Sequence, residues 1–357
     1  MLALAGYPLG VRCEFYDRTA DTPGGQVGPI TTGEFDDLAR LRRLARRVDV
    51  LTFDWENVPV ASLAALARVK PAYPQPAALA VAQDRLLEKT LFRDLGIPTP
   101  AFAPVDLRRD LEAAVARIGL PGVLKTRRFG YDGKGQVRIA RRTDLKRAWR
   151  ELGGQPLIYE RYVDFERELS LVAVRGRRGE LAFYPLVENV HEHGILAHTR
   201  APYRDARLQR AAERHVRAIL AHFGYVGVLA VEFFVADGRL LANEMAPRVH
   251  NSGHWTIEGA VTSQFENHLR AILGLPLGST AARGHAAMVN FVGRLPRAAR
   301  ALALPGLHLH DYGKSVARAG RKLGHATLVA ASPAQRDAGL KTLLRLRGRP
   351  RIAGPRP

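Results

Sequence analysis

The sequence predicts a multidomain α/β protein whose first domain is Rossmann-like. Within residues 1–75 the expected helices and strands alternate, and a helix over 34–46 is followed by a buried strand over 48–53. Alternation of this kind indicates a parallel sheet with crossover helices. The chain has 357 residues, which is enough for about two or three domains of ordinary size. We therefore expect further domains after the first.

The N-terminal domain is expected to lack its first strand. A parallel α/β unit normally opens with a strand, whereas here a helix starts at the first residues and a strand over 11–16 follows it. The first strand and any Gly-rich loop would precede Met1. Glu56 stands just past the end of the 48–53 strand, where open α/β sheets bind ligands. An ordinary polar loop is the alternative at this position.

Two amphipathic helices follow a Pro-rich linker over 71–76. Asp84 is a good N-cap for the first helix, whose leucines recur every fourth residue from Leu87 until Gly96 ends it. The second helix is expected over 106–118. We place a domain boundary at the linker.

Two short strands then flank a loop that is rich in glycine and contains a lysine, with Gly130, Gly133, Lys134 and Gly135. Glycine lets backbone N–H groups approach an anion closely, and lysine neutralises the charge of that anion. The loop lacks the Gly-x4-Gly-Lys-Ser/Thr signature of a P-loop, and no helix follows it. A flexible hairpin over nucleotide phosphates and a plain Gly-rich turn both fit these residues.

A hairpin over 228–244 carries two acids that are candidates for a metal site. If its loop has three residues centred on Gly238, Glu232 pairs with Glu244. Like charges directly opposite each other destabilise a sheet, so this register calls for a cation, and Mg²⁺ suits carboxylate and phosphate oxygens. A two-residue Asp-Gly turn is the alternative. It would place Glu232 opposite Asn243 and leave an ordinary surface hairpin.

The net charge of +20, from 54 Lys and Arg against 34 Asp and Glu, raises the question of a nucleic-acid partner. Much of the excess is dispersed arginine on expected helices such as 38–47, and such a face is usually solvated. The dense basic cluster over 345–357 contains too much glycine and proline for a helix, and we expect a disordered tail there. We therefore do not expect nucleic acid as a partner.

The compartment is expected to be cytoplasmic. A single cysteine, Cys13, excludes an internal disulfide and fits a reducing environment. The N-terminus has no basic region before its short apolar run, so it does not have the pattern of a signal peptide. The longest apolar run, 219–236, is interrupted by His222, Glu232 and two glycines, so no membrane role is indicated.

Taken together, these segments resemble the ATP-grasp superfamily and, within it, the N5-carboxyaminoimidazole ribonucleotide synthase family. The resemblance covers the chain from Met1 to about residue 325. The motifs that carry it are 130–136 (GYDGKGQ), 183–189 (FYPLVEN), 224–228 (GYVGV), 243–255 (NEMAPRVHNSGHW), 263–266 (SQFE) and 321–325 (RKLGH). Phe129, where the loop commonly has another glycine, and Asp54, where a longer acid is common, depart from the pattern.

The resemblance implies an ATP-grasp fold with an N-terminal Rossmann-like (pre-ATP-grasp) domain lacking its first strand and a small C-terminal β-rich domain. The implied boundaries are 1–76 for the N-terminal domain and 77–275 for the ATP-grasp domain, with its small lobe at about 100–165. A C-terminal domain over 284–332 and a basic, partly disordered tail over 333–357 would follow. The resemblance also implies a homodimer.

The resemblance further implies a set of site residues. Catalytic roles fall to Arg248, His250 and Lys134, and Mg²⁺ would be held by Glu232 and Glu244. The residues implied for ATP are Arg85, Lys125, Gly130, Tyr131, Asp132, Gly133, Lys134, Gly135, Gln136, Glu160, Arg161, Tyr162, Val163, Glu168, His191, Asn243 and Glu244. The residues implied for bicarbonate and aminoimidazole ribonucleotide are Glu56, Tyr131, Asp132, Arg248, His250, Asn251, Ser252, Lys314 and Arg321.

The implied reaction is the ATP-dependent carboxylation of 5-aminoimidazole ribonucleotide with bicarbonate in purine biosynthesis. It would give N5-carboxyaminoimidazole ribonucleotide, ADP and phosphate through carboxyphosphate. One alternative is another ATP-grasp ligase, such as a formate-dependent phosphoribosylglycinamide formyltransferase. A second alternative is an inactive truncated homologue that binds nucleic acid nonspecifically, which would bind DNA with a steep salt dependence.

Overall fold

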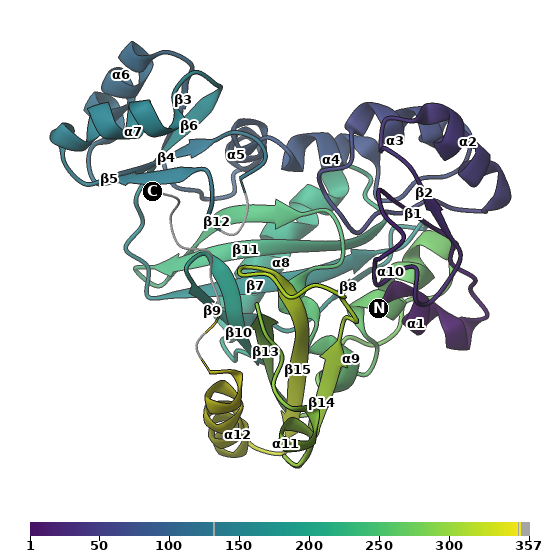
Figure 1. The fold of residues 1–357 in the computed structure, drawn as a ribbon. Coiled ribbons are helices and arrows are strands. Elements are labelled where there is room, and N and C mark those ends of the chain that lie inside the picture. The colour runs from purple at the N-terminus through teal and green to yellow at the C-terminus, as the bar shows by residue number, and fades with distance from the viewer. Residues whose placement is uncertain (131–132, 349, 351–357) are drawn as a thin grey trace.

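The computed structural model describes residues 1–130, 133–348 and 350, and Figure 1 shows helices and smaller sheets arranged around a large central sheet. The N-terminal region combines a two-stranded parallel sheet with short helices. Its elements are α1 (Leu2–Gly6), η1 (Tyr7–Leu9), β1 (Phe15–Asp17), β2 (Ile30–Thr32), α2 (Leu38–Arg47), α3 (Val60–Ala67) and α4 (Pro76–Ala82). The chain thus begins in a helix, as the sequence predicts.

The predicted strand over 48–53 is wrong as a strand. Among the described residues, this segment makes one isolated parallel bridge, from Leu51 to Ala72. Leu51 N–H donates to Pro71 O and Tyr73 N–H donates to Leu51 O, both at 2.8 Å. The neighbouring segment is flanked by prolines, which have no N–H with which to extend a ladder. The 48–53 segment is therefore extended without being part of a regular sheet.

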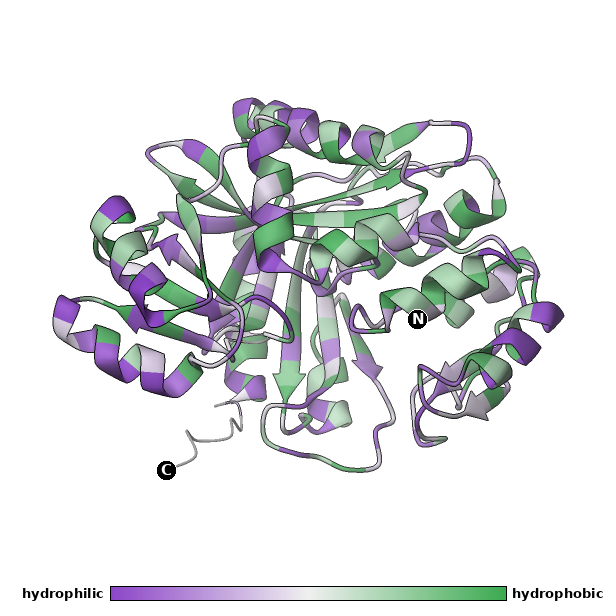
Figure 2. Ribbon diagram, turned by 90° about the horizontal axis from the view of Figure 1, so that it is seen from above, coloured by the Kyte–Doolittle hydropathy of each residue, from purple (hydrophilic) through white to green (hydrophobic). Residues whose placement is uncertain are grey.

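The small lobe is a four-stranded antiparallel sheet in the order β3-β6-β4-β5, covered by two helices. Figure 2 shows hydrophobic and hydrophilic residues alternating along these helices, as expected where one helix face packs on a sheet. The elements are β3 (Phe102–Val105), α6 (Arg108–Ile118), β4 (Gly122–Thr126), β5 (Gln136–Ile139), η2 (Arg142–Asp144), α7 (Leu145–Leu152) and β6 (Leu157–Arg161). Strands β4 and β5 flank the glycine-rich loop, as predicted.

The central sheet has nine strands, and its order is β12-β11-β7-β9-β10-β13-β15-β14 with β8 paired to β7. Helices α8 and α10 pack on it and bury its apolar faces. Its first elements are β7 (Arg167–Arg175), β8 (Leu181–Phe183), β9 (Val187–Glu192), β10 (Ile195–Ala201), α8 (Ala206–His222), β11 (Gly227–Ala236), β12 (Arg239–Ala246), η3 (Asn251–Gly253), α9 (Thr256–Gly259) and α10 (Gln264–Leu273).

The C-terminal region continues the same sheet rather than forming a separate one, because β13 pairs with β10. Its elements are β13 (His285–Val292), α11 (Ala298–Leu302), β14 (Leu307–Asp311), β15 (Lys322–Ala330) and α12 (Pro333–Arg347). The expectation that residues 345–347 lie in a non-helical tail is wrong. Helix α12 packs on β13 and β15, buries Leu340 and Leu343, and ends at Gly348, where the helix-breaking residues begin. No helix among the described residues is long and apolar enough to cross a membrane.

Helix α5 (Arg85–Asp94) joins the small lobe to the central sheet. Its predicted cap is confirmed, because the Asp84 carboxylate accepts the Leu86 N–H at 3.0 Å. The same carboxylate binds the Arg127 guanidinium, with Nε and Nη2 at 2.9 and 2.7 Å. Although burial alone raises the pKa of Asp84, the hydrogen bond and charge of Arg127 outweigh it and lower the pKa below 3.8. One buried acid therefore starts α5 and anchors the segment after β4.

We predict that Asp84→Asn destabilises the fold through the loss of the ion pairs with Arg127 and Arg128, because asparagine is also a good N-cap. The expected loss in the free energy of unfolding at pH 7 is about 1.5–3 kcal/mol. Since the folded pKa is lowered, the carboxylate stabilises the fold above its unfolded pKa and loses that effect as the pH falls. Urea denaturation should therefore show the deficit shrinking below about pH 5. A deficit that is independent of pH would contradict this assignment.

Candidate functional site

A cavity of about 640 Å³ lies between the small lobe, the central sheet and the N-terminal region. Most of the residues that the sequence marks as site residues line it. These are Glu56, Arg85, Lys125, Gly130, Gly133, Gln136, Glu160, Arg161, Tyr162, Val163, Glu168, His191, Glu232, Asn243, Glu244, Arg248, His250 and Asn251. The structure thus brings together residues from all three regions of the chain.

The register of the β11–β12 hairpin combines both sequence hypotheses. Asp237 and Gly238 form a two-residue turn, both with positive φ, so the three-residue loop is wrong. A β-bulge at Asn243 then inserts one residue into β12, and Glu232 stands opposite Glu244 after all. Because a bulge re-aims side chains next to it, Asn243 and Glu244 both line the cavity. The carboxylate pair therefore depends on the bulge and not on the turn.

The two carboxylates have different surroundings. Burial raises the pKa of Glu232, and the charge of Glu244 raises it further, to about 7. Burial also acts to raise the pKa of Glu244, but the charges of Arg85, 3.4 Å away, Lys125 and His191 together outweigh it and lower that pKa. His250 Nε2 lies 3.7 Å from Glu232 Oε1. The pair thus carries negative charge that the surrounding protein offsets on the Glu244 side.

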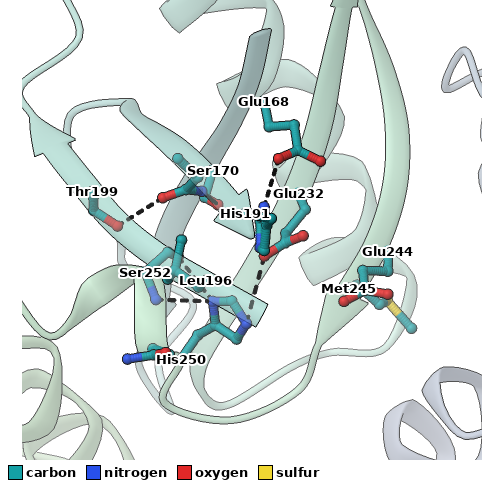
Figure 3. A network of polar contacts seen from close by, with 12 residues as sticks. Glu168, Ser170, His191, Leu196, Thr199, Glu232, Glu244, Met245, His250 and Ser252 are labelled. Atoms are coloured by element: carbon teal, nitrogen blue, oxygen red, sulfur yellow. Dashed lines mark hydrogen bonds and ion pairs between the residues drawn. The ribbon is translucent and has the colours of Figure 1, made fainter. Parts of the chain in front are cut away.

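His191 and Glu168 form a close pair beside Glu232 (Figure 3). The His191 Nδ1–H donates to Glu168 Oε2 at 2.5 Å. Burial lowers the pKa of His191, but the Glu168 hydrogen bond and the charges of Glu232 and Glu168 together raise it to about 9. His191 is therefore a cation at neutral pH, next to the acids of the hairpin.

A buried charge network forms one side of the cavity and includes two residues that the sequence did not mark, Glu88 and Lys89. Lys125 Nζ donates to Glu160 Oε2 at 2.9 Å, and Lys89 Nζ lies 3.7 Å from the same oxygen. Burial alone raises the pKa of Glu160, but the charges of Lys125, Lys89 and Arg85 lower it to about 2. Glu160 is thus an anchor for the small lobe and not a free acid.

Glu88 and Lys89 tie α5 to the bulge. Lys89 Nζ donates to Ala242 O at 3.1 Å, and Glu88 Oε1 accepts the Met245 N–H at 2.6 Å. The leucine periodicity located the buried face of α5 only in part, because Leu91 is buried but Leu87 is 43% exposed, and Glu88 and Lys89 are buried as well. The only local signal was the pair of adjacent charges inside a short helix, which ordinarily marks a solvated face.

The segment after β12 supplies the opposite wall of the cavity. Arg248 Nε and Nη2 donate to Glu56 Oε2 at 2.9 and 2.8 Å, which joins this wall to the N-terminal region. His250 Nδ1 accepts the Ser252 N–H at 3.3 Å and lies 2.8 Å from Ser252 Oγ. Asn251 exchanges side-chain hydrogen bonds with Asn290 of β13. Ser252 itself is fully buried and holds the His250 ring instead of facing the cavity.

Several expected site residues do not line the cavity among the described residues. Lys134 and Gly135 are not among the residues that line it, although their neighbours Gly133 and Gln136 are, and Tyr131 and Asp132 fall outside the described residues. Lys314 Nζ donates to Lys322 O, and Arg321 Nη1 donates to Val316 O, both at 2.8 Å. Lys322, which the sequence marks only as part of the 321–325 motif, is adjacent to Arg321 and does line the cavity.

Comparison with known proteins gives a consistent result along the chain. Residues 1–83 match the ribonucleotide synthetase preATP-grasp domain, residues 90–265 the ATP-grasp domain, and residues 286–338 the phosphoribosylaminoimidazole carboxylase C-terminal domain. An N5-carboxyaminoimidazole ribonucleotide synthase of Pseudomonas aeruginosa is 53% identical, over 95% of this chain and 93% of that protein. One of Brucella melitensis is 43% identical, over 92% of each.

Solved structures agree. The crystal structure of N5-carboxyaminoimidazole ribonucleotide synthetase from Thermus thermophilus is similar with a TM-score of 0.93 and 51% identity, covering 100% of this chain and 97% of that one. The Aspergillus clavatus N5-carboxyaminoimidazole synthase, in complex with ADP and 5-aminoimidazole ribonucleotide, has a TM-score of 0.90 and 30% identity. That comparison covers 97% of this chain and 95% of the other.

We predict that His191 is protonated at pH 7.5 in the protein without nucleotide or metal, because its pKa is about 9. A raised folded pKa stabilises the fold below the unfolded value of 6.5, and this stabilisation is lost as the pH rises through 9. Imidazole resonances followed by NMR against pH measure this directly. In Glu168→Gln the pKa should fall toward 6.5, since the hydrogen-bonded charge is gone.

His215 of α8 is the internal control for this titration. Its pKa is lowered by burial and by Arg214, and it should be the same in both proteins. An unchanged His191 pKa in Glu168→Gln would show that Glu168 does not hold the proton there.

Proposed function

This chain belongs to the N5-carboxyaminoimidazole ribonucleotide synthase family of ATP-grasp ligases, and we propose that it carboxylates 5-aminoimidazole ribonucleotide with bicarbonate at the expense of ATP. It is accordingly an ATP-dependent ligase. The proposal is supported by one observation, which is that three features line the same cavity. They are the Glu232–Glu244 pair, Lys125 beside the glycine-rich loop, and the Arg248–Glu56 contact. The first two suit a nucleotide, and the third suits an anionic acceptor.

The ATP site is proposed at the junction of the small lobe and β12. The Arg161 and Tyr162 N–H groups already donate to Ala101 O and Pro121 O. We therefore assign the purine N–H donor to Val163, and the ribose hydroxyls to the carboxylate of Glu168. Arg85, Lys125, Lys134, His191, Asn243 and the loop over 130–136 would surround the phosphates. Cations and glycine N–H groups are what phosphate oxygens need.

The oxygen atoms of the Glu232–Glu244 pair are suitable ligands for Mg²⁺. Glu232 and Glu244 offer hard carboxylate oxygens from paired positions, and burial, followed by the charge of Glu244, raises the pKa of Glu232. Mg²⁺ characteristically takes one or two carboxylates together with substrate phosphates. When bound, the ion would neutralise charge on the transferring phosphoryl group. Both acids would be its ligands, and Asn243 stands beside them on the bulge.

The acceptor side is proposed along the Arg248 to Ser252 segment. Arg248 is held by Glu56 and presents its guanidinium to the cavity. His250 Nδ1 accepts the Ser252 N–H, so the ring proton lies on Nε2, which can donate to a bicarbonate oxygen. Burial, and then the charge of Arg248, hold the pKa of His250 well below its usual value and keep the ring neutral. Lys322, with Lys314 and Arg321, supplies positive charge for the ribonucleotide phosphate.

The proposed chemistry needs no covalent nucleophile. A bicarbonate oxygen takes the γ-phosphoryl group of ATP and ADP leaves; the amine of the acceptor then attacks the carboxyl carbon of carboxyphosphate, releasing phosphate and a proton. Catalysis is then mostly positioning and charge neutralisation, as in phosphoryl transfer generally. Closure of the loop over 130–136 would keep water away from carboxyphosphate.

The function is tested by ADP release with different acceptors. Purified protein should release ADP with ATP, Mg²⁺, bicarbonate and aminoimidazole ribonucleotide together, and much less when any one is omitted. Release with formate and glycinamide ribonucleotide instead would favour the formyltransferase alternative. Steeply salt-dependent DNA binding without any ADP release would favour a nucleic-acid-binding homologue. We also propose a cytoplasmic homodimer, for which light scattering should give twice the 39.3 kDa chain mass.

We predict that Glu232→Gln and Glu244→Gln each lower kcat by on the order of 100-fold or more, because each removes a carboxylate that would hold Mg²⁺ against the phosphates. Added Mg²⁺ should thermally stabilise the ATP complex of the unchanged protein and stabilise neither variant to the same extent. Steady-state ADP release and thermal melts measure the two effects.

Glu213→Gln on α8 is the matched control, since Glu213 pairs with Gln209 and lies outside the cavity lining. It should keep full activity. Activity within a few-fold of normal in both hairpin variants would contradict the assignment of these acids as the metal ligands.

A further inference from the structure

The wall segment of residues 250–256 is built around one buried side chain, Gln264, the first residue of α10. The Gln264 amide is fully buried. Its Oε1 accepts the His250 N–H at 2.9 Å, and its Nε2 donates to His250 O at 2.6 Å. A side-chain amide that satisfies both backbone groups of one residue holds it as a neighbouring strand would. The backbone of His250 is therefore fixed from α10.

Further contacts extend this arrangement along the segment. Gln264 Nε2 lies 3.2 Å from His254 Nδ1. Thr256 Oγ1 accepts the Gln264 N–H at 3.0 Å and donates to Gly253 O at 2.6 Å. A Cβ added to Gly253 would stand 2.6 Å from Gln264 Oε1, so the close approach requires glycine there. The motif over 263–266 thus has a structural purpose at the site.

The position of His250 matters because its two ring nitrogens face different groups. Nδ1 faces Ser252, and Nε2 lies 3.7 Å from Glu232 Oε1 (Figure 3). Gln264 is not among the residues that line the cavity within the described chain. A shift of about 1 Å in a group that positions reactants can cost on the order of 100-fold in rate.

We propose that Gln264 is a positioning residue that sets the acceptor side of the site by fixing the backbone of His250. It acts through His250 and touches no substrate. This inference rests on the proposed carboxylation of aminoimidazole ribonucleotide. According to this proposal, the Gln264 amide affects the binding and reaction of bicarbonate and aminoimidazole ribonucleotide. Binding of ATP depends instead on α5 and the small lobe.

The chain offers a matched control on the same helix. Asn267 is also fully buried, and its amide holds the loop at Gly278, donating to Gly278 O at 3.2 Å and accepting its N–H at 2.8 Å. Asn267 Nδ2 also donates to the Tyr184 hydroxyl at 2.9 Å. Neither Gly278 nor Tyr184 lines the cavity. Gln264→Met and Asn267→Leu therefore remove equivalent backbone clamps at different places.

The test compares Gln264→Met, Thr256→Val and Asn267→Leu in the full chain. For each variant, kcat and KM are measured with ATP, bicarbonate and aminoimidazole ribonucleotide varied one at a time, and Tm is measured by thermal melting. Gln264→Met and Thr256→Val should lower kcat/KM for aminoimidazole ribonucleotide by at least about 10-fold and raise ADP release relative to carboxylated product. The KM for ATP should stay within about threefold. Asn267→Leu should lower Tm comparably and leave all three kinetic parameters and the coupling within about threefold.

If Gln264→Met and Asn267→Leu lose the same amount of Tm and have the same kinetic constants, the proposal is overturned, because the Gln264 amide then only stabilises the fold. A KM for ATP that rises together with the other constants overturns it as well. Thr256→Val removes a hydrogen bond from the same segment by an almost isosteric change. If Gln264→Met does not fold, the kinetic constants of Thr256→Val test the proposal in its place. Wild-type protein that forms no carboxylated product overturns the proposed function itself, and this inference with it.

Discussion

The structure is organised around two carboxylates that neighbouring strands bring face to face. Glu232 and Glu244 are opposite each other on β11 and β12, where like charges destabilise a sheet. The protein offsets only part of this repulsion, through Arg85 on one side and the protonated His191 near the other. Negative charge therefore remains at the floor of the cavity. A divalent cation carrying a polyphosphate is a ligand that such a floor favours, and neutral ligands gain nothing from it.

Next to these acids, helix α5 contacts both the small lobe and the β11–β12 hairpin and so holds the two at a fixed distance from each other. Lys89 lies between Glu160 of β6 and the carbonyl of Ala242, one residue before the bulge, while Glu88 holds the Met245 N–H. Buried ion pairs are weak evidence for stability, but removing one partner leaves an uncompensated charge, so their geometry is strongly enforced. The network thus fixes the distance between the small lobe and the two acids of the hairpin.

The sequence predicted the parts of this arrangement that local rules control. The Asp84 cap, the strands around the glycine-rich loop and the hairpin that turns at Gly238 follow from neighbouring residues and appear in the structure. The bulge at Asn243 does not, because side-chain alternation contains no signal for an inserted residue, and the right pairing was predicted from the wrong turn. The burial of Lys89 was missed for a related reason, since its partners lie 71 and 153 positions away.

The acceptor side was the harder half to predict because it is assembled from the whole chain. Glu56 comes from the N-terminal region, Arg248 and His250 from the segment after β12, and Lys322 from β15, which reaches the site because β13 extends the central sheet. The ATP side that we propose, by contrast, is built mainly from the small lobe, α5 and one hairpin. ATP-grasp ligases with different acceptors have the same nucleotide to bind, so the distant contributions are where acceptor specificity can differ. Gln264, which holds His250 from α10 without lining the cavity, belongs to the acceptor half that we propose.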